Sequence, residues 1–165
     1  MSEKKVYCEG TTDLVVTRVV DAPVEEVWRA WEQPEVVMQW WAPHGYTTPV
    51  AELDFREGGT SLVCMRSPDG EDGCATWHYR NIEPHKRIEF LETFTDRERR
   101  PVDPAELGMP DMQAESPTEV TFEPSADGGT RLTYRAQCYT SEVMLQASKA
   151  GLEQALDKLE AALKK

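Results

Sequence analysis

Residues 142–163, which read EVMLQASKAGLEQALDKLEAAL, decide the fold that we expect for this chain. Leucines recur in this stretch at spacings of seven, four, three and four residues, which places them on one face of an α-helix. They are Leu145, Leu152, Leu156, Leu159 and Leu163. An apolar face of this kind has to pack against another element. The sequence therefore predicts a long amphipathic helix at this end of the chain.

One flank of the leucine face carries mostly small side chains, namely Met144, Ser148, Gly151, Ala155 and Ala162. Glycine in a helix interior costs about 0.5–1 kcal/mol relative to alanine. Close packing of the helix backbone at Gly151 would offset this cost, and so would a cavity beside the helix. We expect a ligand cavity, lined from the helix by Met144, Ser148, Gly151 and Leu152.

A strand and two short helices are predicted near the other end of the sequence. Residues 14–20 are rich in β-branched side chains and predict a first strand. Apolar residues from Val24 to Trp31 then recur at helical spacing, and Asp21 is placed to cap this helix. Pro34 interrupts it, and a second short helix follows that ends near Trp40 and Trp41.

Six further stretches alternate as strands do, and turn signals such as Pro68-Asp69-Gly70 join them as hairpins. The stretches are residues 48–55, 60–66, 74–82, 87–95, 118–123 and 130–139. Centring the hairpins on their turns predicts a register. It pairs Ser61 with Trp77, Cys64 with Cys74, Tyr79 with Phe90, Trp77 with Glu92, Val120 with Tyr134 and Phe122 with Leu132.

Because side chains alternate between the two faces of a sheet, this register predicts one apolar and one mixed face. The apolar face carries Val63, Met65, Ala75, Trp77, Tyr79, Ile88, Phe90 and Phe94, and the mixed face carries His78, Arg80, Glu89 and Thr93. The order of elements predicts an α+β fold. In it, a curved antiparallel sheet of about six to seven strands wraps around the long C-terminal helix.

Length and charge limit the possible partners. A chain of 165 residues is expected to form one domain over residues 1–165, with its core in 14–163 and a loosely held tail in 1–12. The net charge of −12 opposes binding to nucleic acid and to anionic membranes. No stretch reaches the ~18 apolar residues of a membrane helix, so we expect no membrane insertion and a cytoplasmic location.

The cysteines do not follow the spacing of a zinc site, and we expect no metal and no cofactor. They are Cys8, Cys64, Cys74 and Cys138. The hairpin register brings Cys64 opposite Cys74, where a disulfide would be possible if the geometry allowed it. A reducing cytoplasm argues against this bond, so buried free thiols are predicted.

Residues 95–117 contain four prolines, a charged run and no periodicity, which predicts a long loop. Met109 and Met112 would allow this loop to close over an apolar ligand as a lid. The composition favours the other interpretation, a mobile surface loop.

Several motifs along the chain resemble those of the SRPBCC (START-like) superfamily. They are Asp21-Ala-Pro23 with Val27-Trp28, Trp40-Trp41 before Pro43 and Gly45, Asp54-Phe-Arg56-Glu-Gly58-Gly59, Met65 before Pro68-Asp-Gly70, Ile82-Glu-Pro84, and Gly151-Leu-Glu-Gln-Ala-Leu156-Asp-Lys-Leu159. Within it, the sequence is similar to the branch named after the C-terminal domain of the Aha-type activator of the heat-shock chaperone ATPase. The resemblance covers residues 15–163. It departs at Ser61, where relatives often have an aromatic residue, at Trp77, where they often have a small one, and at Leu152, where they often have tryptophan.

This resemblance implies a helix-grip fold with a cavity between the sheet and the long helix. The function we expect is binding of an apolar or aromatic small molecule or lipid by a monomer or homodimer. The predicted site consists of Trp41, Ser61, Val63, Met65, Trp77, Tyr79, Phe90, Glu92, Met144, Ser148, Gly151 and Leu152. A co-chaperone role is the less favoured alternative, because the Aha-type activator also uses a separate N-terminal domain for which this sequence has no room.

An enzyme of the cyclase or hydrolase type is the remaining alternative, with Glu92 or Tyr79 as its acid–base group. The register places Glu92 on the apolar face, where a buried carboxyl group would have a raised pKa. The interpretation that we favour is that Glu92 lies near a strand end and reaches water, because buried glutamates are rare. No serine lies in a nucleophile motif, and His44 is expected in a solvated loop. We therefore predict no catalytic residue, with Glu92 as the weak candidate.

Overall fold

The sheet has seven antiparallel strands in the order β1-β7-β6-β5-β4-β3-β2, seen in a computed structural model that describes residues 10–164. The strands are β1 (Thr12–Val20), β2 (Thr47–Glu52), β3 (Thr60–Arg66), β4 (Asp72–Glu83), β5 (Arg87–Thr95), β6 (Glu115–Pro124) and β7 (Thr130–Tyr139). The helices are α2 (Val24–Glu32), α3 (Pro34–Trp40), the short 3-10 helix η1 (Pro104–Leu107) and α4 (Glu142–Leu163). Strands β2 to β7 follow one another across the sheet, and β1 closes it beside β7.

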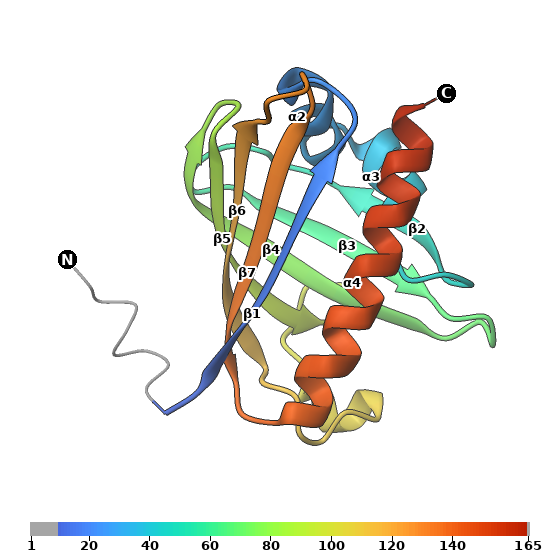
Figure 1. The fold of residues 1–165 in the computed structure, drawn as a ribbon. Coiled ribbons are helices and arrows are strands. Elements are labelled where there is room, and N and C mark those ends of the chain that lie inside the picture. The colour runs from blue at the N-terminus through green and yellow to red at the C-terminus, as the bar shows by residue number, and fades with distance from the viewer. Residues whose placement is uncertain (1–9, 165) are drawn as a thin grey trace.

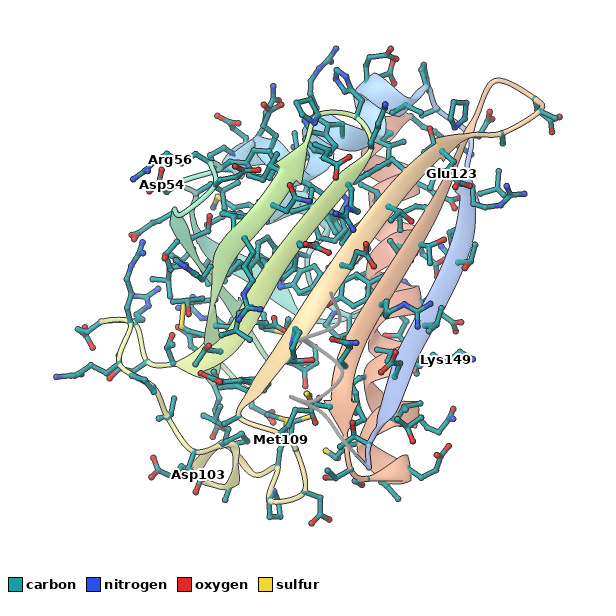
Figure 2. All side chains as sticks on the ribbon, turned by 90° about the vertical axis from the view of Figure 1, so that its left-hand side faces the viewer. Asp54, Arg56, Asp103, Met109, Glu123 and Lys149 are labelled. Carbon is teal, nitrogen blue, oxygen red and sulfur yellow. A yellow bond between two sulfur atoms is a disulfide. The ribbon has the colours of Figure 1, made fainter. Side chains whose placement is uncertain are left out.

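The sheet curves around α4, which lies across its open side, as Figure 1 shows. The predicted helix-grip fold is therefore confirmed. Figure 2 shows the sheet from the side opposite α4, with the loop that carries Asp103 and Met109 at one end and Arg56 and Glu123 at the other.

The predicted strand register is confirmed at every pair that the sequence proposed. Ser61 lies opposite Trp77, Trp77 opposite Glu92, and Tyr79 opposite Phe90. A β-bulge at Arg80 shifts the pairing beyond Tyr79, but Ile88 still points inward and is 1% exposed. The alternation was predictable because the hairpin turns are short and one face has to be buried.

Helix α4 buries the predicted leucine face. Leu156 and Leu159 have no exposed surface. Ser141 caps the helix, because its side chain accepts a hydrogen bond from the backbone N–H of Met144 at 3.2 Å. The elements nearest to α4 are α3, β1, β7 and α2, so the helix lies toward one side of the curved sheet.

Aromatic side chains fill much of the space between α2, α3 and the sheet. The ring of Trp31 lies with its centroid 4.8 Å from that of Trp40, 6.0 Å from Trp41 and 6.0 Å from Trp77. The ring of Tyr134 stacks on it at 6.2 Å. Trp31 is 1% exposed, so it is the centre of an aromatic core.

Two predictions about where elements begin were wrong. Asp21 does not cap α2, because the capping position is occupied by Pro23 and no side chain forms a capping hydrogen bond there. Strand β6 begins at Glu115, three residues earlier than predicted, because residues 115–117 pair with β5. Pro117 lies opposite Leu91 in that pairing, although proline has no N–H to donate to a neighbouring strand.

The prediction of free thiols was also wrong. Cys64 and Cys74 form a disulfide across β3 and β4, with their Cα atoms 4.0 Å apart. Together with Leu62 and Val50 they form a small apolar cluster on the face of the sheet that points away from α4. Cys138 is disulfide-bonded as well, whereas Cys8 lies outside the described residues. The predicted register had placed Cys64 and Cys74 opposite each other. The bond was rejected only because a reducing cytoplasm was assumed.

Gly151 lies against Pro43, so the helix backbone does approach a neighbouring segment there. A β-carbon built at Gly151 would lie 3.4 Å from Cγ of Pro43, which is an ordinary contact distance. We expect Gly151→Ala to raise the free energy of unfolding by about 0.5–1 kcal/mol, because alanine is the better helix former. Urea denaturation followed by circular dichroism measures this change. The matched control is the reverse exchange at the exposed neighbour, Ala150→Gly, which should lose a similar amount. A destabilised Gly151→Ala variant would contradict the expectation.

Candidate functional site

Inward-facing side chains are incompletely buried at one end of the space between the sheet and α4. Deeper in this space, Val63, Trp77 and Phe90 are at most 2% exposed. Toward the end of β3 and the start of α4, the inward residues are only half-buried; they are Met65, Ala75, Glu92 and Phe94 on the sheet and Met144 and Ser148 on the helix. An inward side chain keeps exposed surface only where no other side chain covers it. This end of the interior is therefore the less completely filled one.

The loop after β5 belongs to the same end. It contains η1, and its Met112 is partly buried against the apolar core. Backbone hydrogen bonds tie it to the sheet edge, from Val102 N–H to the carbonyl of Phe94 at 2.9 Å and from Phe94 N–H to the carbonyl of Ala114 at 3.1 Å. The prediction of a long loop is confirmed for residues 96–114. Its role as a lid stays a prediction.

Glu92 is the one acidic residue on the predicted apolar face of the sheet, and its side chain points into this space. It lies within β5 and accepts a hydrogen bond at Oε2 from the indole N–H of Trp77, at 3.2 Å. Burial raises the pKa of Glu92, and the Trp77 hydrogen bond lowers it by less. The interpretation favoured from the sequence, that Glu92 lies near a strand end and reaches water, is corrected in part: Glu92 lies three residues from the end of β5, but it is half-buried and desolvation raises its pKa.

Two tyrosines of β7 lie near Glu92. Burial raises the pKa of Tyr134 well above its ordinary value, and the charge of Glu92 raises it further. Burial also raises the pKa of Tyr139 to about 12, a hydrogen bond with Ser148 lowers it, and Glu92 contributes a smaller increase. Strands β4, β5 and β7 and helix α4 thus bring Trp77, Glu92, Tyr134, Tyr139 and Ser148 together. We call these five residues the Glu92 cluster.

Tyr134 and Tyr139 are the members of the Glu92 cluster that were absent from the predicted site, and the inward position of Tyr139 depends on a bulge. A bulge in β7 places two residues, Gln137 and Cys138, opposite Asp13 alone, and Cys138 has a positive φ of 78°. Simple alternation from Tyr134 would have pointed Cys138 inward and Tyr139 outward. The bulge reverses this, and Tyr139 is 5% exposed. No turn residue in the sequence signals the bulge.

Ser61 and Tyr79 lie elsewhere in the interior and bind each other. Their hydroxyl oxygens are 2.8 Å apart, and Ser61 Oγ also accepts the backbone N–H of Asp54 at 3.0 Å. Burial raises the pKa of Tyr79 to about 12. These two predicted site residues therefore have partners within the protein, and the Tyr79 hydroxyl stays protonated at neutral pH.

The remaining predicted site residues lie around the aromatic core. Trp41 packs edge-on against Trp77 at 5.1 Å between ring centroids, and Leu152 is 7% exposed. Gly151 faces Pro43, as described above. His44 lies in an exposed loop, where its backbone N–H donates to Gln154 at 3.0 Å. Of the predicted set, Trp77, Glu92 and Ser148 come together in the Glu92 cluster.

A separate pocket of about 220 Å³ lies where β7 turns into α4. Its lining is largely polar and includes Thr12, Tyr139, Ser141, Glu142 and Leu145. Tyr139 belongs both to the lining of this pocket and to the Glu92 cluster, so the pocket and the cluster adjoin at this residue.

Other kinds of site were sought in residues 10–164. This part of the chain has no group of three or more His, Cys, Asp or Glu side chains placed to hold a metal ion. None of its helices combines the length and the apolar character that crossing a membrane requires.

The raised pKa of Glu92 predicts how stability depends on pH. The folded protein binds the Glu92 proton more tightly than the unfolded chain, whose ordinary pKa is 4.5. The free energy of unfolding should therefore fall through this group as the pH rises above about 4.5. Glu92→Gln cannot ionise, so we expect it to be more stable than wild type by about 1–3 kcal/mol near pH 8.

Urea denaturation at several pH values between about 4 and 8 measures this difference, which should shrink toward the acidic end. Glu89→Gln, on the mixed face of the same strand, is the matched control; Glu89 contacts Arg87 at 3.0 Å, so this exchange should not stabilise the protein. Equal stability of Glu92→Gln and wild type at every pH would contradict a desolvated Glu92.

Comparison with known proteins identifies the family. Residues 21–164 match the family model described as activator of Hsp90 ATPase homolog 1-like protein. No curated protein matches the chain at a significant level.

Solved structures agree with this match. A protein from Rhizobium leguminosarum is 28% identical with a TM-score of 0.68, covering 93% of this chain and 95% of that one. Protein Ms6760 from Mycobacterium smegmatis is 25% identical with a TM-score of 0.71, covering 94% of this chain and 93% of that one. The AHSA1 protein from Silicibacter pomeroyi is 24% identical with a TM-score of 0.74, covering 93% and 98%. The resemblance predicted from the motifs is thus confirmed, and the chain belongs to the family of activator of Hsp90 ATPase homolog 1-like proteins.

Proposed function

We propose that this protein binds an apolar or aromatic small molecule or lipid between the curved sheet and the N-terminal half of α4. The observation that carries the proposal is the incomplete burial of inward-facing apolar side chains at that end. Met65 and Phe94 on the sheet, Met144 on α4 and Met112 on the loop are all only partly buried. Exposed apolar surface costs free energy in water, and an apolar guest would cover it.

The composition of this region supports the proposal. Ligand sites are mostly apolar and carry a few polar groups that fix the orientation of the ligand. Methionine side chains are flexible and adapt to ligands of different shape. Glu92 and Ser148 supply polar atoms beside them, and the loop of residues 96–114 lies at the same end of the fold.

Binding of N-phenyl-1-naphthylamine, a neutral probe that fluoresces in apolar sites, tests the proposal. Ser148→Phe fills the space from the helix and should weaken binding by roughly tenfold or more, a loss of about 1.4 kcal/mol. Ala147→Phe, one residue earlier on the exposed face of α4, is the matched control and should leave binding unchanged. Equal binding by wild type and both variants, or no binding by any of them, would overturn the proposed site.

An enzyme is the second candidate, and the desolvation of Glu92 favours it. A carboxyl group with a raised pKa, pointing into an apolar space, suits a general acid or base near neutral pH. Tyr79 does not suit this role, because its pKa is raised to about 12 and its hydroxyl is bound by Ser61. Incubation with a metabolite extract should then show turnover that Glu92→Gln abolishes. Turnover that survives in Glu92→Gln would exclude Glu92 as the acid–base group.

A further inference from the structure

Glu92 has an acceptor that the protein does not use. In the described part of the chain, its carboxyl group has one hydrogen-bond partner, the Trp77 indole N–H on Oε2. Its other oxygen, Oε1, is absent from the buried side-chain atoms of residues 10–164 that lack a partner. An oxygen without a partner that is not among these atoms must reach accessible space. Oε1 therefore keeps some accessible surface and has no partner within the described residues.

The surroundings of Glu92 are polar but contain no positive charge. Trp77 approaches it from β4, Tyr134 and Tyr139 from β7, and neither lysine nor arginine in residues 10–164 affects its pKa. Thr118 lowers the pKa of Tyr134 and Ser148 lowers that of Tyr139, so a hydroxyl group lies beside each tyrosine. Glu92 Oε1 is an acceptor at this end that no described residue uses.

A second polar atom in the aromatic core has no partner. The indole Nε1 of Trp31 is buried, and no hydrogen-bond acceptor in residues 10–164 contacts it. Its ring lies 6.0 Å from that of Trp77, which binds Glu92. Buried donors without a partner are rare in native proteins and call for an explanation such as a bound water or ligand. The interior beside Trp77 therefore has spare polar capacity at two points.

We infer that the site selects apolar ligands that carry a hydrogen-bond donor, a hydroxyl or an amine, and that Glu92 Oε1 accepts this donor while carboxylate ligands are rejected. This inference rests on the proposed function, since it names the ligand class of the same site. A donor on the ligand satisfies Oε1 as the ligand displaces water from it. A carboxylate would instead bring a second acceptor and a second negative charge toward Glu92, with no cation to compensate either. The net charge of −12 works in the same direction.

Competition against N-phenyl-1-naphthylamine with a matched series of naphthalene compounds tests the inference. The series is 2-naphthol, a neutral donor; 2-naphthylmethylamine, a cationic donor; naphthalene; and 2-naphthoate, an anion. We expect wild type to bind naphthol or the amine roughly tenfold or more tightly than naphthoate. The stronger of the two donors distinguishes a hydroxyl ligand from an amine ligand.

Two variants assign the preference to Glu92. Glu92→Leu removes the acceptor, so the donor compounds should lose their advantage over naphthalene. Glu92→Gln keeps an acceptor oxygen without the charge, so naphthol should retain its affinity while the amine loses affinity. Thermal unfolding of both variants checks that they are folded.

The outcomes separate the inference from the proposed function. Failure of wild type to bind N-phenyl-1-naphthylamine and every naphthalene compound overturns both. Binding with equal affinity for naphthol and naphthoate overturns the selection alone, as does an unchanged preference in Glu92→Leu. In either of those cases the apolar site itself would stand.

Discussion

Replacing Trp31 with alanine is expected to lower the free energy of unfolding by about 3–5 kcal/mol, the range for large aromatic-to-alanine changes in a core. Trp31 is 1% exposed and its ring contacts those of Trp40, Trp41, Trp77 and Tyr134. Its removal leaves a cavity between α2, α3 and the sheet that these rings cannot all close. Urea denaturation followed by circular dichroism measures the loss.

Two phenylalanine variants separate packing from hydrogen bonding. Trp31 Nε1 has no partner in residues 10–164, so Trp31→Phe should lose packing only. Trp40 Nε1 donates to the carbonyl of Ala30 at 2.9 Å, so Trp40→Phe should also lose a hydrogen bond, at a further cost of about 1 kcal/mol. A Trp31→Ala variant as stable as wild type would show that Trp31 is not central to the core.

The double variant Cys64→Ala/Cys74→Ala should be less stable than the oxidised protein by about 2–3 kcal/mol. The bond joins residues separated by 10 positions, and closing a loop of that length reduces the entropy of the unfolded chain by this amount in the loop-entropy model. The measurement is the urea midpoint of both proteins without reductant.

Reduction of the wild-type protein is a less specific test, because Cys138 is disulfide-bonded as well. The double variant isolates the Cys64–Cys74 bond, and Leu62→Ala in the same outer cluster is a packing control that leaves the bond in place. Equal urea midpoints of double variant and oxidised wild type would mean that this bond contributes no stability.

Part of the candidate site was predictable from the sequence. Trp77 and Glu92 were correctly placed opposite each other on the apolar face, because the turns of the two hairpins fix the register of β3, β4 and β5. Ser148 was correctly placed on the flank of α4 that faces the interior, because helical periodicity is regular. The protonation behaviour of Glu92 was not predictable, because it depends on which side chains exclude water from its carboxyl group.

The sequence by itself determined the order of the elements, the strand register and the leucine face of α4. These features depend on local periodicity and on turns within a few residues of each other. Only the tertiary structure decided that the β7 bulge points Tyr139 inward, that Gly151 meets Pro43, and that β5, β7 and α4 meet around Glu92. These features depend on the curvature of the sheet and on where α4 lies across it, and both result from contacts between residues far apart in the chain.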